Sequence, residues 1–221
     1  MTQDIASTVS PASIDQAMRS SPLAERLPQT DTIASADRNC VLDCTRSERF
    51  GLRGPGTMSW IASREMTAPE KVNAAVILPC GTALLRLGQE EVLFTAPPGG
   101  SGERLREIRQ AWLESTLETK GYDAYREEGW AWFLVSGPAA PELMARISMT
   151  DLRPQGFPVN QVAQTRALHL DVVAVRFDRF GSPSYELFLD VSSAGFALDV
   201  LTETAEGLGS GFQFAELPPG A

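Results

Sequence analysis

Short apolar runs alternate with helical patterns along this chain, and the alternation predicts a mixed fold. Residues 50–55 (FGLRGP) form a predicted strand that ends at a Gly-Pro pair, and residues 58–61 follow it with helical spacing. Residues 132–138 (WFLVSGP) repeat the strand and its Gly-Pro end. The helix after them is predicted to begin at Pro141, because proline is favoured at the first helical position. Both segments therefore predict a strand followed directly by a helix.

The two segments belong to a longer internal repeat. Gly54 and Gly137 are 83 residues apart, and the Met-Thr pairs that begin at residues 66 and 149 have the same separation. Farther along the chain, the run Glu91–Phe94 recurs as Glu186–Leu189. Because several elements match in the same order, the sequence predicts a duplicated unit rather than a chance coincidence of dipeptides.

Each half closes with a predicted amphipathic helix. The first is expected to end at Gly121, with one apolar face formed by Leu105, Ile108, Trp112, Leu113 and Leu117. The second carries Phe196, Leu198, Val200 and Leu201. A sheet face covered by helices is typical of an α+β fold, so we predict two similar α/β half-units related by internal duplication.

Residues 1–38 are rich in Ser, Thr, Ala, Asp and Gln, and they are predicted to form a flexible N-terminal arm. Within this arm, residues 21–27 (SPLAERL) have a proline where a helix would begin, so this stretch could dock in a complex. Residues 39–221 are predicted to form the folded domain, with half-units of about 39–122 and 123–210.

Composition narrows the classes of partner. Hydrophobic residues make up 43% and charged residues 21% of the chain, which is enough apolar material for a sizeable core. The net charge is −9, and no cluster of Lys or Arg forms a basic patch. We therefore expect neither nucleic acid nor a membrane as a partner. No run reaches the ~20 apolar residues of a membrane span, no secretory signal opens the chain, and a cytoplasmic location is expected.

The usual reactive residues are sparse. Cys40, Cys44 and Cys80 are an odd set, and with the single His169 they do not complete a metal site, so we expect no metal and three buried or partly buried free thiols. His169 lies in an alternating segment and is expected to be a structural residue on a strand. The glycine-rich loop 97–102 (PPGGSG) lacks the lysine of a phosphate-binding loop and is expected to be a turn.

Tyr185 and Glu186 are the candidate binding residues. They follow the turn at residues 180–183 and open a strand, so the Glu186 carboxylate could project into a pocket and accept hydrogen bonds from a heterocycle. A solvated or cross-strand-paired glutamate is the arrangement that we expect, and the binding role is the alternative. Trp112, Trp130 and Trp132 could stack on a cofactor, although core packing is the usual role of such residues. No catalytic residue is predicted.

A family resemblance accompanies these features. The Gly-Pro pairs of both halves, residues 163–165 (AQT), residues 168–173 (LHLDVV) and residues 185–187 (YEL) resemble the folate-binding domain shared by glycine-cleavage T-protein, dimethylglycine-oxidising enzymes and sarcosine oxidase. Within that superfamily the chain is most similar to the gamma subunits of heterotetrameric sarcosine oxidases, which begin with a Ser-Pro-Leu-Ala arm, as residues 21–24 do here.

The resemblance implies a non-catalytic structural subunit of an oxidoreductase complex, of the sarcosine oxidase or N-methylglutamate dehydrogenase type. Its partners would be the alpha, beta and delta-type subunits, and FAD, FMN, NAD and tetrahydrofolate would serve the complex, with no cofactor assigned to this chain.

The chain differs from T-protein in the residues that the resemblance assigns to folate. T-protein carries an acidic residue, used in folate chemistry, in the region that residues 79–82 (PCGT) occupy here, and this chain has none there. Only Tyr185 and Glu186 match a pterin-contacting position, which suggests a vestigial folate site. Two alternatives stay open: a tetrahydrofolate-binding protein that transfers aminomethyl or one-carbon groups as T-protein does, and an unrelated α+β binding module.

Overall fold

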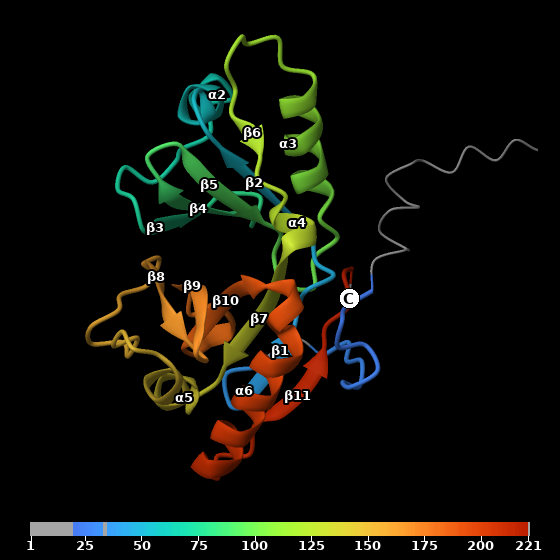
Figure 1. Ribbon diagram of the computed structural model, residues 1–221, viewed down its shortest axis with the longest axis vertical. Coiled ribbons are helices and arrows are strands. Elements are labelled where there is room, and N and C mark those ends of the chain that lie inside the picture. The colour runs from blue at the N-terminus through green and yellow to red at the C-terminus, as the bar shows by residue number, and fades with distance from the viewer. Residues whose placement is uncertain (1–19, 33–34, 221) are drawn as a thin grey trace, which may run out of the picture.

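The computed structural model describes residues 20–32 and 35–220, and these residues build two sheets, each covered by helices on its outer face (Figure 1). The six-stranded sheet, called sheet A, has the order β11 (Gln213–Glu216), β1 (Cys40–Asp43), β7 (Trp130–Ser136), β10 (Ser184–Asp190), β9 (Leu170–Arg176) and β8 (Val162–Ala167). The five-stranded sheet B has the order β3 (Ala74–Ile77), β4 (Ala83–Gly88), β5 (Glu91–Thr95), β2 (Arg49–Arg53) and β6 (Tyr122–Asp123).

The helices lie on the two outer faces. Sheet B carries α2 (Thr57–Ser63) and α3 (Glu103–Leu113), and sheet A carries α5 (Ala140–Ile147) and α6 (Ala194–Leu208). Shorter helices lie in the connections between these elements, namely α4 (Arg126–Gly129) and the 3-10 turns η1 (Arg179–Gly181) and η2 (Val191–Ser193). No helix within the described residues is long and apolar enough to cross a membrane.

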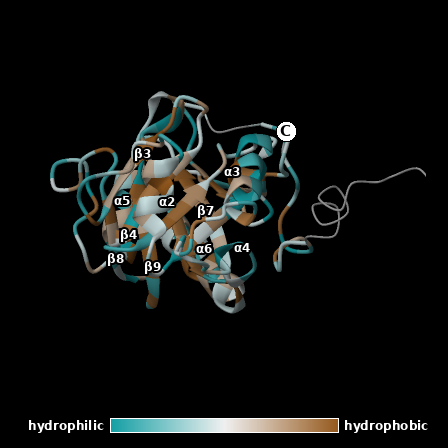
Figure 2. Ribbon diagram, turned by 90° about the horizontal axis from the view of Figure 1, so that it is seen from above, coloured by the Kyte–Doolittle hydropathy of each residue, from teal (hydrophilic) through white to brown (hydrophobic). Residues whose placement is uncertain are grey.

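Three buried clusters hold these layers together. One lies between sheet A and helices α5 and α6, one lies between the two sheets, and one lies between sheet B and helices α2 and α3. Strand β7 shows how one segment serves two clusters, since Phe133 and Val135 face the helices while Trp132 and Leu134 face sheet B. Figure 2 shows the same arrangement, with hydrophobic residues on the central strands and hydrophilic residues on the surrounding loops.

The two halves repeat one topology. In the first half the chain runs β2, α2, β3, β4, β5, α3, and in the second it runs β7, α5, β8, β9, β10, α6. The strand orders also match, because β3-β4-β5-β2 in sheet B corresponds to β8-β9-β10-β7 in sheet A. The predicted α+β class with two similar half-units is therefore confirmed. The half-unit bounds stay a prediction, since β1 precedes the first half in sequence but pairs with β7 and β11 of sheet A.

The strand register corrects one detail of the repeat. If Gly54 corresponds to Gly137, then Gly51 of β2 corresponds to Leu134 of β7. Gly51 pairs with Leu93 and Leu134 pairs with Glu186. Glu186 therefore corresponds to Leu93, not to Glu91 as the similarity of the two runs suggested, because strand pairing rather than letter similarity fixes which side chains are equivalent.

Helix α5 begins as predicted, with Pro141 in its first turn and Leu143, Met144 and Ile147 buried against sheet A. Helix α3 is shorter than predicted. It ends at Leu113, and both Leu113 and Leu117 are exposed. The Lys120 ammonium donates to the carbonyl oxygens of Trp112 (2.8 Å), Leu113 and Ser115, and it thereby satisfies the free acceptors at the helix end. Helix α6 buries Leu198 and Leu201 but exposes Phe196.

Part of the predicted N-terminal arm contacts the domain. Residues 1–19, 33 and 34 lie outside the described residues. Residues 22–26 form turns rather than a helix, and Leu23 is fully buried in the cluster under α5 and α6. The Ser21 hydroxyl donates to the buried Asp43 carboxylate, and the Thr30 N–H donates to the Glu216 carbonyl at 2.9 Å. The segment Ser21–Thr30, called the docked segment below, therefore lies along the edge of sheet A at β11.

Candidate functional site

Glu186 lies in the middle of β10, where both neighbouring strands are apolar. It pairs across the sheet with Leu134 of β7 and Val175 of β9. Its side chain has the same orientation as Phe188, two residues later, and so it points into the cluster between the two sheets. Glu186 is completely buried, and its counterpart in the other half is the apolar Leu93. A carboxylate thus occupies a position that the fold fills with a leucine in the other half.

Tyr185 points the other way. Its ring belongs to the cluster between sheet A and helices α5 and α6, since consecutive residues of a strand project to opposite faces. The Tyr185 hydroxyl is buried without a hydrogen-bond partner, and burial raises the pKa of Tyr185 to about 12. The structure therefore does not bring the two candidate residues to one site, because a full sheet separates the phenol from the carboxylate.

Arg179 is the partner of Glu186. Its Nε donates to Glu186 Oε1 at 2.8 Å, and the two side chains are 12% and 1% exposed. Arg179 lies in η1, between β9 and β10, where Asp178 and Phe180 adopt positive φ values of 48° and 65°. The Arg179 N–H donates to Ser184 Oγ at 2.7 Å, which fixes the turn against β10. The expectation of a solvated or cross-strand-paired glutamate is wrong, because the turn before the strand supplies the counter-ion.

The ion pair of Glu186 and Arg179 is buried, and this burial shifts the pKa of Glu186. Desolvation raises the pKa of Glu186 above its usual value, while the charge and hydrogen bond of Arg179 oppose the shift without reversing it. Glu186 Oε2 and Arg179 Nη2 are buried and have no hydrogen-bond partner in the described chain. None of three sizeable surface cavities, of about 400, 440 and 670 Å³, is lined by either residue. The carboxylate therefore faces its arginine and apolar side chains rather than an open pocket.

The cysteines do not form a metal site in this part of the structure. Cys40 and Cys44 are buried free thiols, and the described residues contain no group of three His, Cys, Asp or Glu side chains placed to hold a metal ion. Burial raises the pKa of Cys40 to about 11 and also raises the pKa of Cys44. Cys80 was expected to be buried or partly buried but is exposed, because it lies on the turn between β3 and β4.

The environment of Cys80 differs from that of the other thiols. Partial desolvation raises its pKa, but hydrogen bonds from the Thr82 side chain and backbone, its own backbone N–H and the Arg104 charge outweigh this effect. The net result is a pKa below the ordinary value of 9.0. His169 is also on the surface, in the two-residue turn between β8 and β9, and not on a strand as expected.

The side chain of Glu48 packs against the glycine-rich loop at residues 97–102. This loop connects β5 to α3, and a side chain at Gly102 would lie 2.2 Å from Glu48 Cγ. Arg106 Nη1, from the first turns of α3, donates to Glu48 Oε1 at 3.1 Å. The Glu48 side chain therefore packs directly against Gly102 at the start of α3, and the loop contains the expected turn, at residues 98–99.

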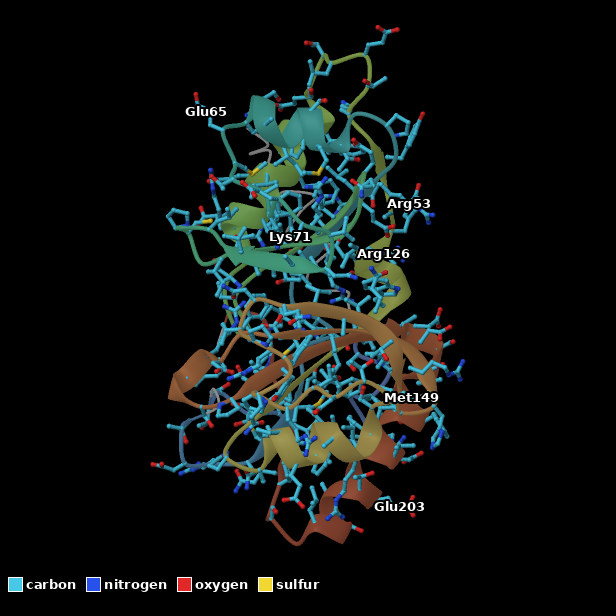
Figure 3. The ribbon with its side chains drawn as sticks, turned by 90° about the vertical axis from the view of Figure 1, so that its left-hand side faces the viewer. Arg53, Glu65, Lys71, Arg126, Met149 and Glu203 are labelled. Atoms are coloured by element: carbon cyan, nitrogen blue, oxygen red, sulfur yellow. The ribbon has the colours of Figure 1, made fainter. Side chains whose placement is uncertain are left out.

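Two of the three tryptophans considered for cofactor stacking pack in the core. Trp132 lies against Phe188 with 5.4 Å between ring centroids, and Trp112 lies at the same separation from Phe50. Trp130 is half-buried and lines the 670 Å³ cavity, and the Arg126 guanidinium, labelled in Figure 3, lies 4.0 Å from the centroid of the Trp130 ring. Core packing thus accounts for Trp112 and Trp132.

Arg179 was not predicted as the partner of Glu186. The available signal was Glu186 itself, since an acidic residue within an apolar strand buried on both faces requires a nearby cation. The turn at residues 177–183 carries the nearest such cation in sequence.

Comparisons with known proteins extend over most of the chain. No family model matches it. The sequence is 28% identical over 155 residues to the sarcosine oxidase subunit gamma of Corynebacterium sp. (strain P-1), which covers 70% of this chain and 73% of that protein. The structure is similar to a chain of the heterotetrameric sarcosine oxidase from Corynebacterium sp. U-96 in complex with pyrrole 2-carboxylate. The TM-score is 0.67 at 22% identity, and the match covers 87% of this chain and 97% of that one.

A second structural relative is more distant. The glycine cleavage system aminomethyltransferase T from Bartonella henselae matches with a TM-score of 0.56 at 12% identity, over 82% of this chain and 48% of that one. The resemblance predicted from the sequence is therefore confirmed: the chain is similar in sequence to a gamma subunit of sarcosine oxidase and shares its fold with that enzyme and with T-protein.

Proposed function

We propose that this chain is a non-catalytic accessory subunit, of the gamma type, in a heterotetrameric flavoenzyme that oxidises sarcosine or a related N-methyl amino acid. The observation that carries the proposal is the combined match to a gamma subunit in sequence and to nearly the whole of one chain of the assembled oxidase in structure.

The environment of Glu186 supports the same proposal. A residue that binds a heterocycle needs an acceptor that a ligand can reach, whereas Glu186 is completely buried between the sheets and pairs through Oε1 with Arg179. In this proposal Tyr185 and Glu186 are remnants of a folate-binding position and serve packing. The flavins FAD and FMN, together with NAD and tetrahydrofolate, belong to the alpha, beta and delta-type subunits of the complex, which works in the cytoplasm.

The alternative is a tetrahydrofolate-binding protein that transfers one-carbon groups as T-protein does. The favouring observation is the T-protein fold, but at 12% identity this likeness concerns the fold alone. The chain also spans only 48% of that relative. The alternative requires the isolated chain to bind tetrahydrofolate and the binding to depend on Glu186.

The deciding experiment is affinity purification of the tagged full chain from its native cells, with identification of the co-purifying proteins and a visible absorbance spectrum. We expect three further subunits in fixed stoichiometry and a flavin spectrum. A chain that elutes alone, as a monomer without flavin, would overturn the proposal. In that case tetrahydrofolate titration of the full chain would decide the alternative, with Glu186→Ala as the test variant and Glu65→Ala, an exposed carboxylate of the other half, as the control.

A further inference from the structure

A groove of about 440 Å³ lies on the helix-covered face of sheet A, between α6 and the docked segment. Its apolar floor consists of Leu27, Leu198 and Phe214, which belong to or pack against the cluster beneath α5 and α6. Figure 1 shows α6 lying beside β11, the strand that carries Phe214. The groove therefore extends the core to the surface, and the docked segment forms its second wall.

The rim of the groove carries an excess of negative charge. Asp199, Glu203 and Glu206 of α6 line it, and Arg26 is the one basic residue among the described residues that line it. Arg26 Nη2 donates to the Asp199 carboxylate, and its Nη1 donates to the Gly195 carbonyl oxygen at 3.2 Å, so this guanidinium is already paired. The carboxylates of Glu203 and Glu206 are exposed and form no ion pair or hydrogen bond with any described residue. Two negative charges therefore remain uncompensated beside an apolar floor.

The position of these glutamates is unfavourable for α6 itself. The helix ends at Leu208, and its last turn contains Glu206 and no basic residue. The carboxyl end of a helix carries a partial negative charge, so an acidic side chain there is destabilising and a cation is stabilising. Helix stability thus does not explain the two carboxylates, whereas a bound cation would relieve the repulsion.

Charge also discriminates among the occupants that the groove could take. Residues 1–19 of this chain contain two acidic residues and one basic residue, and a second copy of the chain carries a net charge of −9. Neither supplies the excess of positive charge that matches the rim. A lysine or arginine of a partner protein fits instead, because its methylene stem can lie on the apolar floor while its charged head reaches the carboxylates.

We propose that this groove binds a partner protein through a segment that carries a basic residue beside an apolar one. The basic head pairs with Glu203 and Glu206, and the apolar side chain packs against Leu27 and Phe214. This inference rests on the proposed function and deepens it, since it names the chemistry of a contact with another subunit. Its test uses the isolated full chain, so its failure is distinct from a failure of the affinity purification.

The probe is the synthetic peptide Gly-Phe-Arg-Leu-Arg-Gly with a rhodamine label, and its binding is followed by fluorescence anisotropy. We expect a dissociation constant on the order of 100 μM at about 50 mM salt, and severalfold weaker binding at about 300 mM salt, because the ion pairs are exposed to solvent. A peptide with both arginines replaced by glutamate should not bind at about 1 mM. No binding of the basic peptide at about 1 mM, or equal binding of the two peptides, would overturn the proposal. Equal affinity for n-butylamine would assign the groove to a small amine, and self-association through the groove would assign it to a second copy; either outcome would also overturn it.

Variants then locate the contact. Glu203→Gln combined with Glu206→Gln should weaken peptide binding about tenfold. The same change should leave the Tm unchanged or raise it by about 1–3 °C, since it removes negative charge from the end of α6. Glu65→Gln combined with Glu70→Gln is the matched control, because it removes two exposed carboxylates from the other half, and Figure 3 shows Glu65 and Glu203 at opposite ends of the molecule. An equal loss of binding in the two double variants would show that net charge alone matters, and a fall in the Tm of the groove variant would show that its glutamates stabilise the fold; either result would refute the assignment.

Discussion

The buried pair of Glu186 and Arg179 allows a quantitative test of how the interior between the sheets is stabilised. Arg179→Met keeps a long side chain but removes the guanidinium. The Glu186 carboxylate, which is 1% exposed, is then left without its ion-pair partner. Removing one partner of a buried pair typically costs about 3–5 kcal/mol, and both members here are largely withdrawn from water. We therefore expect a loss of unfolding free energy in this range.

The double variant should recover most of that loss. Glu186→Leu introduces the side chain that the other half carries at the corresponding position, Leu93. Combined with Arg179→Met, it removes both desolvated charges, and such replacements are often neutral or stabilising. The double variant is expected within about 1 kcal/mol of the parent chain, so that the losses of the single variants are strongly non-additive.

The loss of stability caused by Arg179→Met should depend on pH, and the direction follows from the pKa of Glu186. Burial raises the pKa of Glu186 in the folded chain, and Arg179 opposes that rise, so Arg179→Met should raise this pKa further. An unfolded glutamate titrates near a pKa of about 4.3. Between that value and the higher folded pKa, the folded state binds more protons than the unfolded state, and stability falls as the pH rises. The loss caused by Arg179→Met should thus be smaller at about pH 5 than at about pH 8.

Urea unfolding followed by tryptophan fluorescence, at both pH values, measures these differences. The control is Arg166→Met, which removes an exposed arginine 3.6 Å from the exposed Asp171, and a change within about 0.5 kcal/mol is expected for such a surface pair. A loss below about 1 kcal/mol for Arg179→Met, or single losses that simply add in the double variant, would contradict a stabilising buried ion pair between Glu186 and Arg179.

Three further outcomes follow from other parts of the fold. Leu23→Ala should lower the unfolding free energy by about 2–5 kcal/mol in urea, and a loss below about 1 kcal/mol would contradict the burial of the docked segment. Iodoacetamide should modify Cys80 in the folded chain but reach Cys40 and Cys44 only after unfolding, as mass spectrometry of the peptides would reveal. His169→Gly should raise the Tm slightly, because both residues of that turn have positive φ and glycine is favoured there.

The elements that could be predicted from the sequence are those whose two faces differ in polarity, or whose ends carry residues typical of a helix start or a strand end. Helix α5 is the clearest case, since Pro141 marks its start and three apolar residues at helical spacing define its buried face. The duplication was visible because Gly54 and Gly137 both end a strand and both adopt positive φ. A side chain at Gly137 would lie 2.4 Å from the Arg38 carbonyl oxygen, so backbone crowding explains this glycine.

The sequence could not predict the orientation of residues in strands that are buried on both sides. Strand β10 is buried from Ser184 to Leu189, so no polar alternation marks which face each side chain takes. Tyr185 and Glu186 were therefore expected at one site although they lie on opposite faces of the sheet. The end of α3 was missed for a different reason, since the Lys120 contacts that terminate it come from outside the helix.

The asymmetry between the two halves is the strongest argument about the candidate site. The fold repeats its strand order and its elements, yet at one matched position it places Leu93 in β5 and Glu186 in β10. The connections differ as well, because β4 and β5 are joined by two residues while the turn before β10 is longer and contains Arg179. A carboxylate kept to receive a ligand would need a cavity beside it, whereas here the longer turn folds back and supplies a counter-ion. The glutamate and the turn therefore act as one structural unit that closes the interior between the sheets.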